Sequence, residues 1–189
     1  LFIVDEVQAG FGRTGRWFSI EHFGVVPDGV VCGKSISSGI PLSAFVARSD
    51  VLADWEAPAH TFSSVANLIG CAAALATIRV ISEEGLVERA RVNGEYLRGR
   101  LHEMAERHEL IGDIRGEGLM TGAELVTSRG TREPAKDITA KVAWRCWELG
   151  LLITFLRGNV LRMGPPLVIE RSQLDDALDI LDRALGEVA

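Results

Sequence analysis

Lys34 is the residue of this sequence whose surroundings most favour chemistry. It is one of three lysines beside seventeen arginines, and it follows an apolar stretch and precedes a loop rich in Gly, Ser and Pro. A side chain at a strand end reaches into a crevice of the sheet, where an amine can attack a carbonyl carbon. A solvated lysine with its stem along a loop fits the position alone equally well. The other lysines, Lys136 and Lys141, fit the solvated face of a helix.

Asp5 and Gln8 add polar groups at the end of another apolar strand, predicted over residues 1–7. A carboxylate at one strand end and a lysine at a nearby strand end can converge on a single ligand. Pyridoxal phosphate (PLP) needs this pair, because the lysine holds its aldehyde and the carboxylate keeps its ring nitrogen protonated. The ring then withdraws electrons from the substrate carbon, and the released lysine amine is the natural base there.

Two glycine-rich segments compete with this interpretation, and their context argues against both. Residues 10–15 match the dinucleotide pattern G-x-G-x-x-G, but two carboxylates close the strand before them and would repel pyrophosphate. Gly33-Lys34-Ser35 resembles the end of a phosphate-binding loop, yet three residues separate Gly29 from Gly33 where that loop has four. We therefore expect no nucleotide site in either segment.

Composition and charge restrict the partners of the chain. Its 189 residues are 47% hydrophobic and carry a formal net charge of −6. This acidity argues against nucleic acid, which requires a clustered basic face, and no apolar run approaches the roughly 18 residues of a membrane span. Neither the three cysteines nor the four histidines show metal or disulfide spacing. We expect a cytoplasmic protein without a metal site.

Two regions of different texture must position these residues. The first has apolar strands bounded by Gly and Pro, over 1–7, 29–33 and 42–47, and an Ala-rich helix over 65–81. A long amphipathic helix follows, whose inward positions are Leu86, Ala90, Asn93, Leu97, Leu101 and Met104. The chain starts inside an apolar strand, so we expect it to be a portion of a longer protein.

The second region alternates strands and helices. Its strands are predicted over 110–114, 119–126, 151–155 and 160–163. One helix faces inward with Ile138, Val142, Cys146 and Leu149, and a last helix, capped by Ser172, faces inward with Leu174, Leu178, Leu181 and Leu185. We expect Trp144 and Trp147 to pack on or beside the inner face of the first helix. The pattern indicates an α/β fold in two parts, with a boundary inside the long helix.

Six short motifs occur in order along nearly the whole chain. They are Asp5-Glu-Val-Gln-Ala-Gly-Phe-Gly-Arg-Thr-Gly15, Pro27-Asp28, Gly33-Lys34 with Gly39-Ile-Pro41-Leu-Ser-Ala44, His60-Thr61-Phe62, Gly112-Asp-Ile-Arg-Gly116, and Val160-Leu-Arg162 with Pro165-Pro-Leu167. Together they resemble the class III (ω-amino acid) PLP-dependent aminotransferases, nearest the 4-aminobutyrate and acetylornithine branches.

The resemblance implies the type I PLP-dependent transferase fold. Residues 1–85 would be the C-terminal part of the PLP-binding large domain, and residues 86–189 the connecting helix and the C-terminal small domain. Asp5 would be the partner of the pyridinium nitrogen and Gln8 a neighbour of the ring hydroxyl. Lys34 would carry the internal aldimine and shuttle the proton.

Two further residues take roles from the resemblance. Thr61 corresponds to a threonine that reaches the cofactor phosphate of the other subunit, which implies a homodimer. Arg162 corresponds to an arginine that often holds a substrate carboxylate, with an exposed ion pair as the alternative. The family usually continues Thr-Phe with Gly-Gly-Asn-Pro, where this chain has Ser63-Ser-Val-Ala-Asn67. This departure bears on substrate shape more than on the cofactor.

The predicted function is a ping-pong aminotransferase, which moves an amino group from an amino acid, by resemblance an ω-amino acid, to a 2-oxo acid. A relative that decarboxylates or isomerises its substrate is the alternative among enzymes, because the cofactor contacts are shared and the substrate bond perpendicular to the ring decides the outcome. A non-catalytic structural homologue is the alternative outside enzymes. The joint presence of Asp5, Lys34 and Thr61 argues against it.

Overall fold

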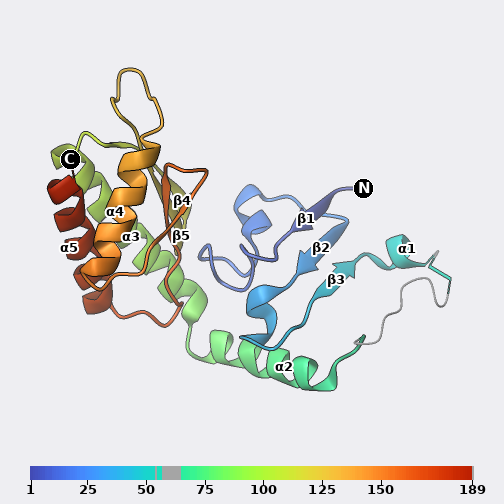
Figure 1. Ribbon diagram of the computed structural model, residues 1–189. Helices are drawn as coiled ribbons and strands as arrows, with labels where there is room; N and C mark the ends of the chain where they lie inside the picture. The colour runs from blue at the N-terminus through green and yellow to red at the C-terminus, as the bar shows by residue number, and fades with distance from the viewer. Residues whose placement is uncertain (54, 57–64, 189) are drawn as a thin grey trace. The chain divides into compact units, whose positions relative to one another are not determined.

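The computed structural model describes residues 1–53, 55–56 and 65–188 of the chain (Figure 1). The chain divides into two compact units, Leu1–Glu88 and Arg89–Ala189, which we call unit 1 and unit 2. The long helix α3 (Leu86–Arg107) begins in unit 1 and continues in unit 2.

Unit 1 is built on a three-stranded sheet. In pairing order its strands are β1 (Ile3–Asp5), β2 (Gly29–Cys32) and β3 (Ala44–Ala47). β1 and β2 are parallel, with Ile3 opposite Gly29, so their carboxyl ends lie at the same edge. β3 is antiparallel to β2. Short 3₁₀ helices follow the first two strands, η1 (Ser19–Phe23) after β1 and η2 (Lys34–Ser37) after β2.

The helices of unit 1 after β3 are α1 (Ser49–Leu52) and α2 (Leu68–Glu83). Asn67 caps α2, because its side-chain oxygen accepts hydrogen bonds from the Ile69 amide at 3.2 Å and the Gly70 amide at 3.3 Å. α2 packs against η2. Most of its apolar side chains are nevertheless exposed; the buried positions are Gly70, Ala74 and Ile81.

Unit 2 is an antiparallel sheet covered by helices. In pairing order its strands are β4 (Ile111–Glu117), β5 (Met120–Leu125), β7 (Val160–Met163) and β6 (Thr154–Leu156). Its helices after α3 are α4 (Lys136–Glu148) and α5 (Arg171–Val188). Figure 1 shows α4 and α5 side by side next to the sheet. One apolar core joins α3, α4 and α5 to β4, β5 and β7.

The predicted inward faces of three helices are confirmed in their burial. All six inward positions of α3 are buried, from Leu86 to Met104. In α4, Val142 and Cys146 are fully buried, and burial raises the pKa of the Cys146 thiol to about 11. In α5, the four predicted leucines are buried. Helical spacing of apolar residues was therefore a reliable guide to the core of unit 2.

A close backbone contact brings α3 against the turn between β4 and β5. A Cβ atom on Gly94 would lie 2.1 Å from the Gly118 carbonyl oxygen, which no side chain tolerates. Gly94 is buried, as is Gly118. The absence of a side chain at position 94 thus lets the helix lie directly on the turn.

Three expectations for unit 2 were wrong in detail. Ser172 lies inside α5, which begins at Arg171, so it is not the capping residue. The strand predicted over 151–155 is displaced to β6, whose three residues are exposed. Trp144 and Trp147 are 62% and 56% exposed, because Thr139, Val142, Ala143 and Cys146 occupy the inward face of α4.

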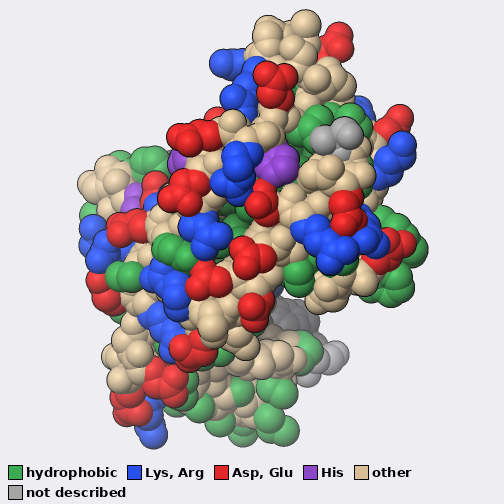
Figure 2. All heavy atoms as spheres, turned by 90° about the vertical axis from the view of Figure 1, so that its left-hand side faces the viewer, with side chains coloured by type: hydrophobic (Ala, Val, Ile, Leu, Met, Phe, Trp, Pro, Cys, Tyr) green, Lys and Arg blue, Asp and Glu red, His purple; other side chains and the backbone are tan. Residues whose placement is uncertain are grey.

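The surface mixes charges of both signs. Figure 2 shows basic and acidic side chains interleaved over the visible face, and ion pairs account for part of this pattern. Arg100, for example, lies 3.0 Å from Asp175 and 3.5 Å from Asp179. Among the described residues, no helix is long and apolar enough to cross a membrane, and no cluster of His, Cys, Asp and Glu could hold a metal ion.

Candidate functional site

The shared edge at the carboxyl ends of β1 and β2 is where three of the predicted site residues lie. Asp5 is the last residue of β1 and is opposite Val31 in the parallel register. The pairing extends one residue further, because the Glu6 amide donates to the Val31 carbonyl at 2.9 Å. Lys34 follows β2 after the single residue Gly33. Asp5 and Lys34 therefore start from adjacent strand ends.

Lys34 has an unusual backbone and a defined polar contact. Its φ of +42° lies in the left-handed region, which costs a residue with a Cβ about 1–2 kcal/mol. Positions under such strain cluster at functional sites. The side chain is exposed, and its Nζ donates to Gln8 Oε1 at 2.8 Å. The structure thus brings two predicted site residues into direct contact.

Asp5 is held at the same edge by its own strand end. Its Oδ1 accepts a hydrogen bond from the Val7 amide at 2.9 Å. The residue is exposed, so a ligand at this edge can reach its carboxylate. Within the described residues, no hydrogen bond joins Asp5 to Lys34 or to Gln8.

These three side chains fit pyridoxal phosphate by their chemistry. The Lys34 amine suits the aldehyde, and the Asp5 carboxylate suits a protonated pyridine nitrogen. Gln8 accepts a hydrogen bond from the lysine amine on Oε1, and its amide nitrogen keeps two donors for a ring hydroxyl. The amine and the carboxylate follow adjacent strand ends, and the amide contacts the amine.

Thr61 lies outside the described residues, together with His60 and Phe62. Its predicted contact with the cofactor phosphate stays a prediction. Ser63, the first residue of the departure from the family pattern, is also outside them.

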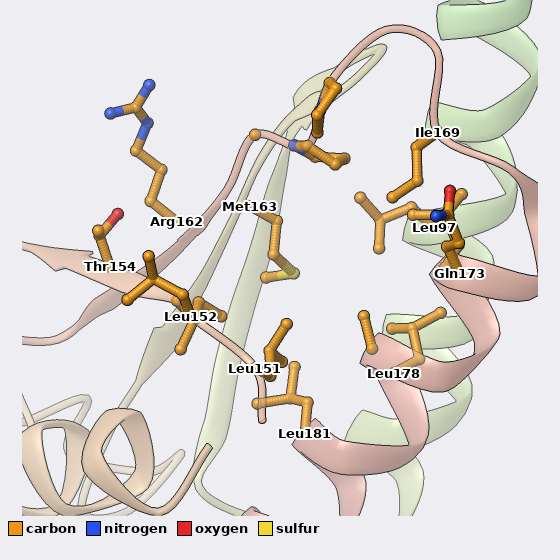
Figure 3. Close-up of a pocket in the computed structure, with 16 residues that line it drawn as sticks. Leu97, Leu151, Leu152, Thr154, Arg162, Met163, Ile169, Gln173, Leu178 and Leu181 are labelled. Atoms are coloured by element: carbon orange, nitrogen blue, oxygen red, sulfur yellow. The ribbon is translucent and has the colours of Figure 1, made fainter. Parts of the chain in front are cut away.

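Arg162 belongs to unit 2. It lies on β7, opposite Gly122 of β5 and Thr154 of β6, and it is half-buried. It borders a cavity of about 490 Å³ that is lined mainly by aliphatic side chains. Figure 3 shows Met163 directed into this cavity and the Arg162 guanidinium directed away from the lining leucines. Arg162 makes no ion pair within the part of the chain that the structure describes.

Glu6 is a buried carboxylate at the site edge that the motif spacing did not single out. Its side chain is fully buried, although it directly follows the exposed Asp5. Its Oε1 accepts hydrogen bonds from Ser19 Oγ and from the Ile20 amide, both at 2.8 Å. Burial, and next the nearby Glu6 carboxylate, raise the pKa of the Cys32 thiol. The sequence signal that could have identified Glu6 is a carboxylate directly after an apolar strand.

Comparison with known proteins places this edge in a family context. Residues 1–185 match the family described as "Aminotransferase class-III". The chain is 50% identical over 188 residues to the leucine/methionine racemase of Thermococcus litoralis, covering 100% of this chain and 42% of that protein. It is 46% identical over 189 residues to the isoleucine 2-epimerase of Lentilactobacillus buchneri, with coverage of 100% and 42%.

Aminotransferases are similar at somewhat lower identity. The 4-aminobutyrate aminotransferase of Mycobacterium leprae is 42% identical over 194 residues, with 99% of this chain and 42% of that protein covered. The crystal structure of a transaminase from the marine bacterium Virgibacillus superposes with a TM-score of 0.94 at 32% identity, covering 100% of this chain and 45% of that one. The chain thus spans about 42% of the length of these curated relatives. It has the α/β fold of PLP-dependent transaminases, and it belongs to the class III aminotransferase family.

Proposed function

We propose that the whole protein is a PLP-dependent enzyme that acts at the amino-bearing carbon of an amino acid. The observation that carries the proposal is the 2.8 Å contact between Lys34 Nζ and Gln8 Oε1 at the edge where Asp5 ends β1. When bound, pyridoxal phosphate withdraws electrons from the substrate carbon and makes its proton removable. Every other role falls to side chains of the protein.

The side chains of unit 1 divide this work. Lys34 binds the cofactor aldehyde and, once released, moves the proton at the substrate carbon. Asp5 holds a proton on the pyridine nitrogen by its negative charge. Gln8 orients the lysine amine and the ring hydroxyl. Thr61 holds the cofactor phosphate of the partner subunit in a homodimer.

The proposal also covers the domains, the role of Arg162 and the compartment of the protein. Residues 1–85 form the end of the cofactor-binding large domain, and residues 86–189 form the connecting helix and the small domain. Arg162 grips a substrate carboxylate through two parallel hydrogen bonds, for which a planar guanidinium is suited. We place the protein in the cytoplasm, because its three cysteines fit a reducing compartment.

Transamination is the first candidate reaction. An amino donor, by resemblance an ω-amino acid, leaves as its oxo product, and its amino group passes to a 2-oxo acid in a second half-reaction. Family membership supports this candidate. It requires an acceptor for turnover.

Racemisation or epimerisation of an α-amino acid is the second candidate, and sequence identity favours it. The relatives named for racemase and epimerase activity are 50% and 46% identical, against 42% for the aminotransferase named for 4-aminobutyrate. The Cα–H bond breaks and re-forms on the opposite face, with no net oxidation. Turnover therefore requires no 2-oxo acid.

One experiment separates the two. Full-length protein with pyridoxal phosphate is incubated in D₂O with L-leucine, L-methionine or 4-aminobutyrate, with and without 2-oxoglutarate. Chiral chromatography and mass spectrometry follow the products. A deuterated D-amino acid without acceptor identifies racemisation. An oxo product that exceeds one equivalent of enzyme only with acceptor identifies transamination, because the first half-reaction alone releases one equivalent. Release of CO₂ or an amino-shifted product would identify the decarboxylase or aminomutase alternative. Wild-type protein that binds no cofactor would overturn the proposal.

A further inference from the structure

Glu6 lies between Asp5 and Gln8, two residues that the proposed function uses. Its backbone is fixed on both sides, because its amide donates to Val31 at 2.9 Å and its carbonyl accepts from the Gly10 amide at 3.0 Å. Its side chain is fully buried. Backbone hydrogen bonds on both sides and burial thus hold this residue in place.

The Glu6 side chain connects two distant parts of unit 1. Its Oε1 receives the Ser19 hydroxyl and the Ile20 amide, each at 2.8 Å. These donors are 13 and 14 residues further along the chain. One carboxylate oxygen therefore closes residues 7–18 into a loop, which we call the Gln8 loop.

The Gln8 loop is packed around this closure. The Phe11 and Phe18 rings lie edge to face at 5.7 Å between centroids. The Gly12 amide donates to the Trp17 carbonyl at 3.3 Å. These contacts hold the loop compact, and the hydrogen bonds from Ser19 and Ile20 to the Glu6 carboxylate tie its far end back to the residue that follows β1. The side chain of Gln8, two residues after Glu6, accepts a hydrogen bond from Lys34 at 2.8 Å.

Stability alone gives a weak reason for a carboxylate here. A buried carboxylate is costly unless its oxygens are all paired. Glu6 Oε2 is buried and has no hydrogen-bond partner among the described residues. An apolar side chain of similar size would fill the same volume without that cost. Such a side chain could not accept the two hydrogen bonds that close the loop.

We propose that Glu6 is a positioning residue that fixes Gln8 against Lys34 by holding the far end of the Gln8 loop. The inference rests on the proposed function, since Lys34 and Gln8 are there the groups that bind the cofactor. Because its side chain is fully buried, Glu6 would act through Gln8 and not on the cofactor itself.

The test uses full-length protein carrying Glu6→Ala, Glu6→Gln or Ser19→Ala. Glu21→Ala is the matched control, because Glu21 is exposed, lies in η1 three residues beyond the Gln8 loop, and accepts a hydrogen bond from the Phe18 amide at 2.8 Å. Hydrogen–deuterium exchange on cofactor-free protein measures the exchange rates of the backbone amides in the loop. Equilibrium dialysis and the visible absorbance maximum of bound pyridoxal phosphate read the site.

Glu6→Ala should raise amide exchange over residues 7–20 about tenfold, weaken cofactor binding about tenfold and shift the absorbance maximum, as expected for two lost hydrogen bonds to a charged acceptor. Glu6→Gln keeps an acceptor oxygen and should restore most of each value. Ser19→Ala, which keeps the carboxylate, should move them in the same direction by about threefold and serves if Glu6→Ala does not fold. Glu21→Ala should change each by less than about twofold.

Unchanged exchange and absorbance in both Glu6→Ala and Ser19→Ala would overturn the inference. A general loss of stability with an unshifted absorbance maximum would also overturn it, since that result marks a merely structural carboxylate. The proposed function is checked separately on wild-type protein, by borohydride trapping of the cofactor and peptide mapping. A label away from Lys34 would defeat the proposed function, whereas the exchange data would still report whether Glu6 closes the loop.

Discussion

Unit 1 and unit 2 of this chain bury their side chains in different ways. Unit 2 encloses a continuous apolar core in which Leu101, Leu125, Val142, Leu161 and Leu185 are all fully buried. Within this chain, which spans about 42% of the length of its curated relatives, unit 1 leaves many apolar side chains exposed, and α2 alone exposes Leu68, Ile69, Leu75, Ile78 and Val80. Figure 2 shows apolar side chains gathered at the lower end of the view, where α2 lies.

The closed apolar core and the candidate site lie in different units of the chain. Three of the described candidate site residues, Asp5, Gln8 and Lys34, are in the unit with less apolar burial. There, polar contacts hold the loops, such as the Glu6 carboxylate on Ser19. In unit 2, burial of aliphatic side chains holds the fold. Mutations in the two units should therefore produce different kinds of loss.

The largest effect is expected from Lys34→Ala, which tests the chemical side of the comparison. No other lysine lies in unit 1, so turnover of the full-length protein should fall by at least about four orders of magnitude. The melting temperature of the cofactor-free protein should stay close to wild type, because the side chain is exposed. Steady-state kinetics and a thermal melt measure both. Lys141→Ala, exposed on α4, is the control and should leave both unchanged. Retained turnover in Lys34→Ala contradicts the assignment.

Leu101→Ala tests the opposite side of the comparison. Leu101 is fully buried in the core of unit 2, so its truncation should lower the free energy of unfolding by about 2–5 kcal/mol. Leu152→Ala, the same change at a side chain that is 81% exposed, should cost less than about 0.5 kcal/mol. Urea unfolding measures both. Equal losses would show that the difference in burial between these leucines does not govern stability.

Two glycines of α3 sharpen the comparison within unit 2. Gly94→Ala places a Cβ 2.1 Å from the Gly118 carbonyl oxygen, so helix and turn must separate at a cost of about 1–3 kcal/mol. Gly99→Ala meets no atom within 4 Å and should stabilise the helix by about 0.5–1 kcal/mol. Thermal melts of both variants give opposite signs if the close contact is real. A stabilised Gly94→Ala would disprove it.

The smallest effect concerns Glu124 on β5. Hydrogen bonds from Arg115 at 2.7 Å, and next from Asn159 at 3.2 Å, lower the pKa of the Glu124 carboxyl below its usual 4.5. A lowered pKa in the folded state stabilises the fold above the unfolded-state pKa, and this contribution is lost as the pH falls through the folded-state pKa. Glu124→Gln should therefore cost about 0.5–1 kcal/mol at pH 7 and flatten the loss of stability below about pH 4.5.

The control for Glu124→Gln is Glu117→Gln. Glu117 is exposed and lies 3.7 Å from Arg98, so its removal should leave the pH dependence of unfolding close to wild type. Urea unfolding at a series of pH values between 3 and 7, taken with about half-unit spacing, compares the two variants. Identical curves for Glu124→Gln and wild type would remove the stabilising role of the Arg115 contact.

The helical spacing of apolar residues predicted much of the fold of unit 2, because each of its helices buries one face in a core formed by residues of this chain. The spacing of Leu86, Leu97 and Leu101, and of Val142 and Cys146, predicted burial that the structure confirms. The exposure of Trp144 was not predictable from its size. An aromatic residue two positions beyond Val142 lies on the opposite side of the helix, and only the helical geometry reveals it.

The candidate site was predicted through strand ends, since residues that close parallel strands share one edge of a sheet. This rule predicted that Asp5 and Lys34 lie at neighbouring positions, and the contact of Lys34 with Gln8 agrees with that prediction. The sequence did not single out Glu6 as a functional residue, because its partners Ser19 and Ile20 come close to it only in the folded loop. Long-range hydrogen bonds of single side chains leave no periodic trace in a sequence.

The two exposed tryptophans of α4 give unit 2 an optical label of its own. The rings of Trp144 and Trp147 lie 4.9 Å apart between centroids, tilted by 36°. At this separation their electronic transitions couple, which produces a paired band of opposite signs in circular dichroism. The loss of that band on heating reports the melting of α4 without any added dye. Because both rings are open to solvent, acrylamide quenching of their fluorescence, in a variant without Trp17 and Trp55, further reports whether this face becomes covered when a partner binds.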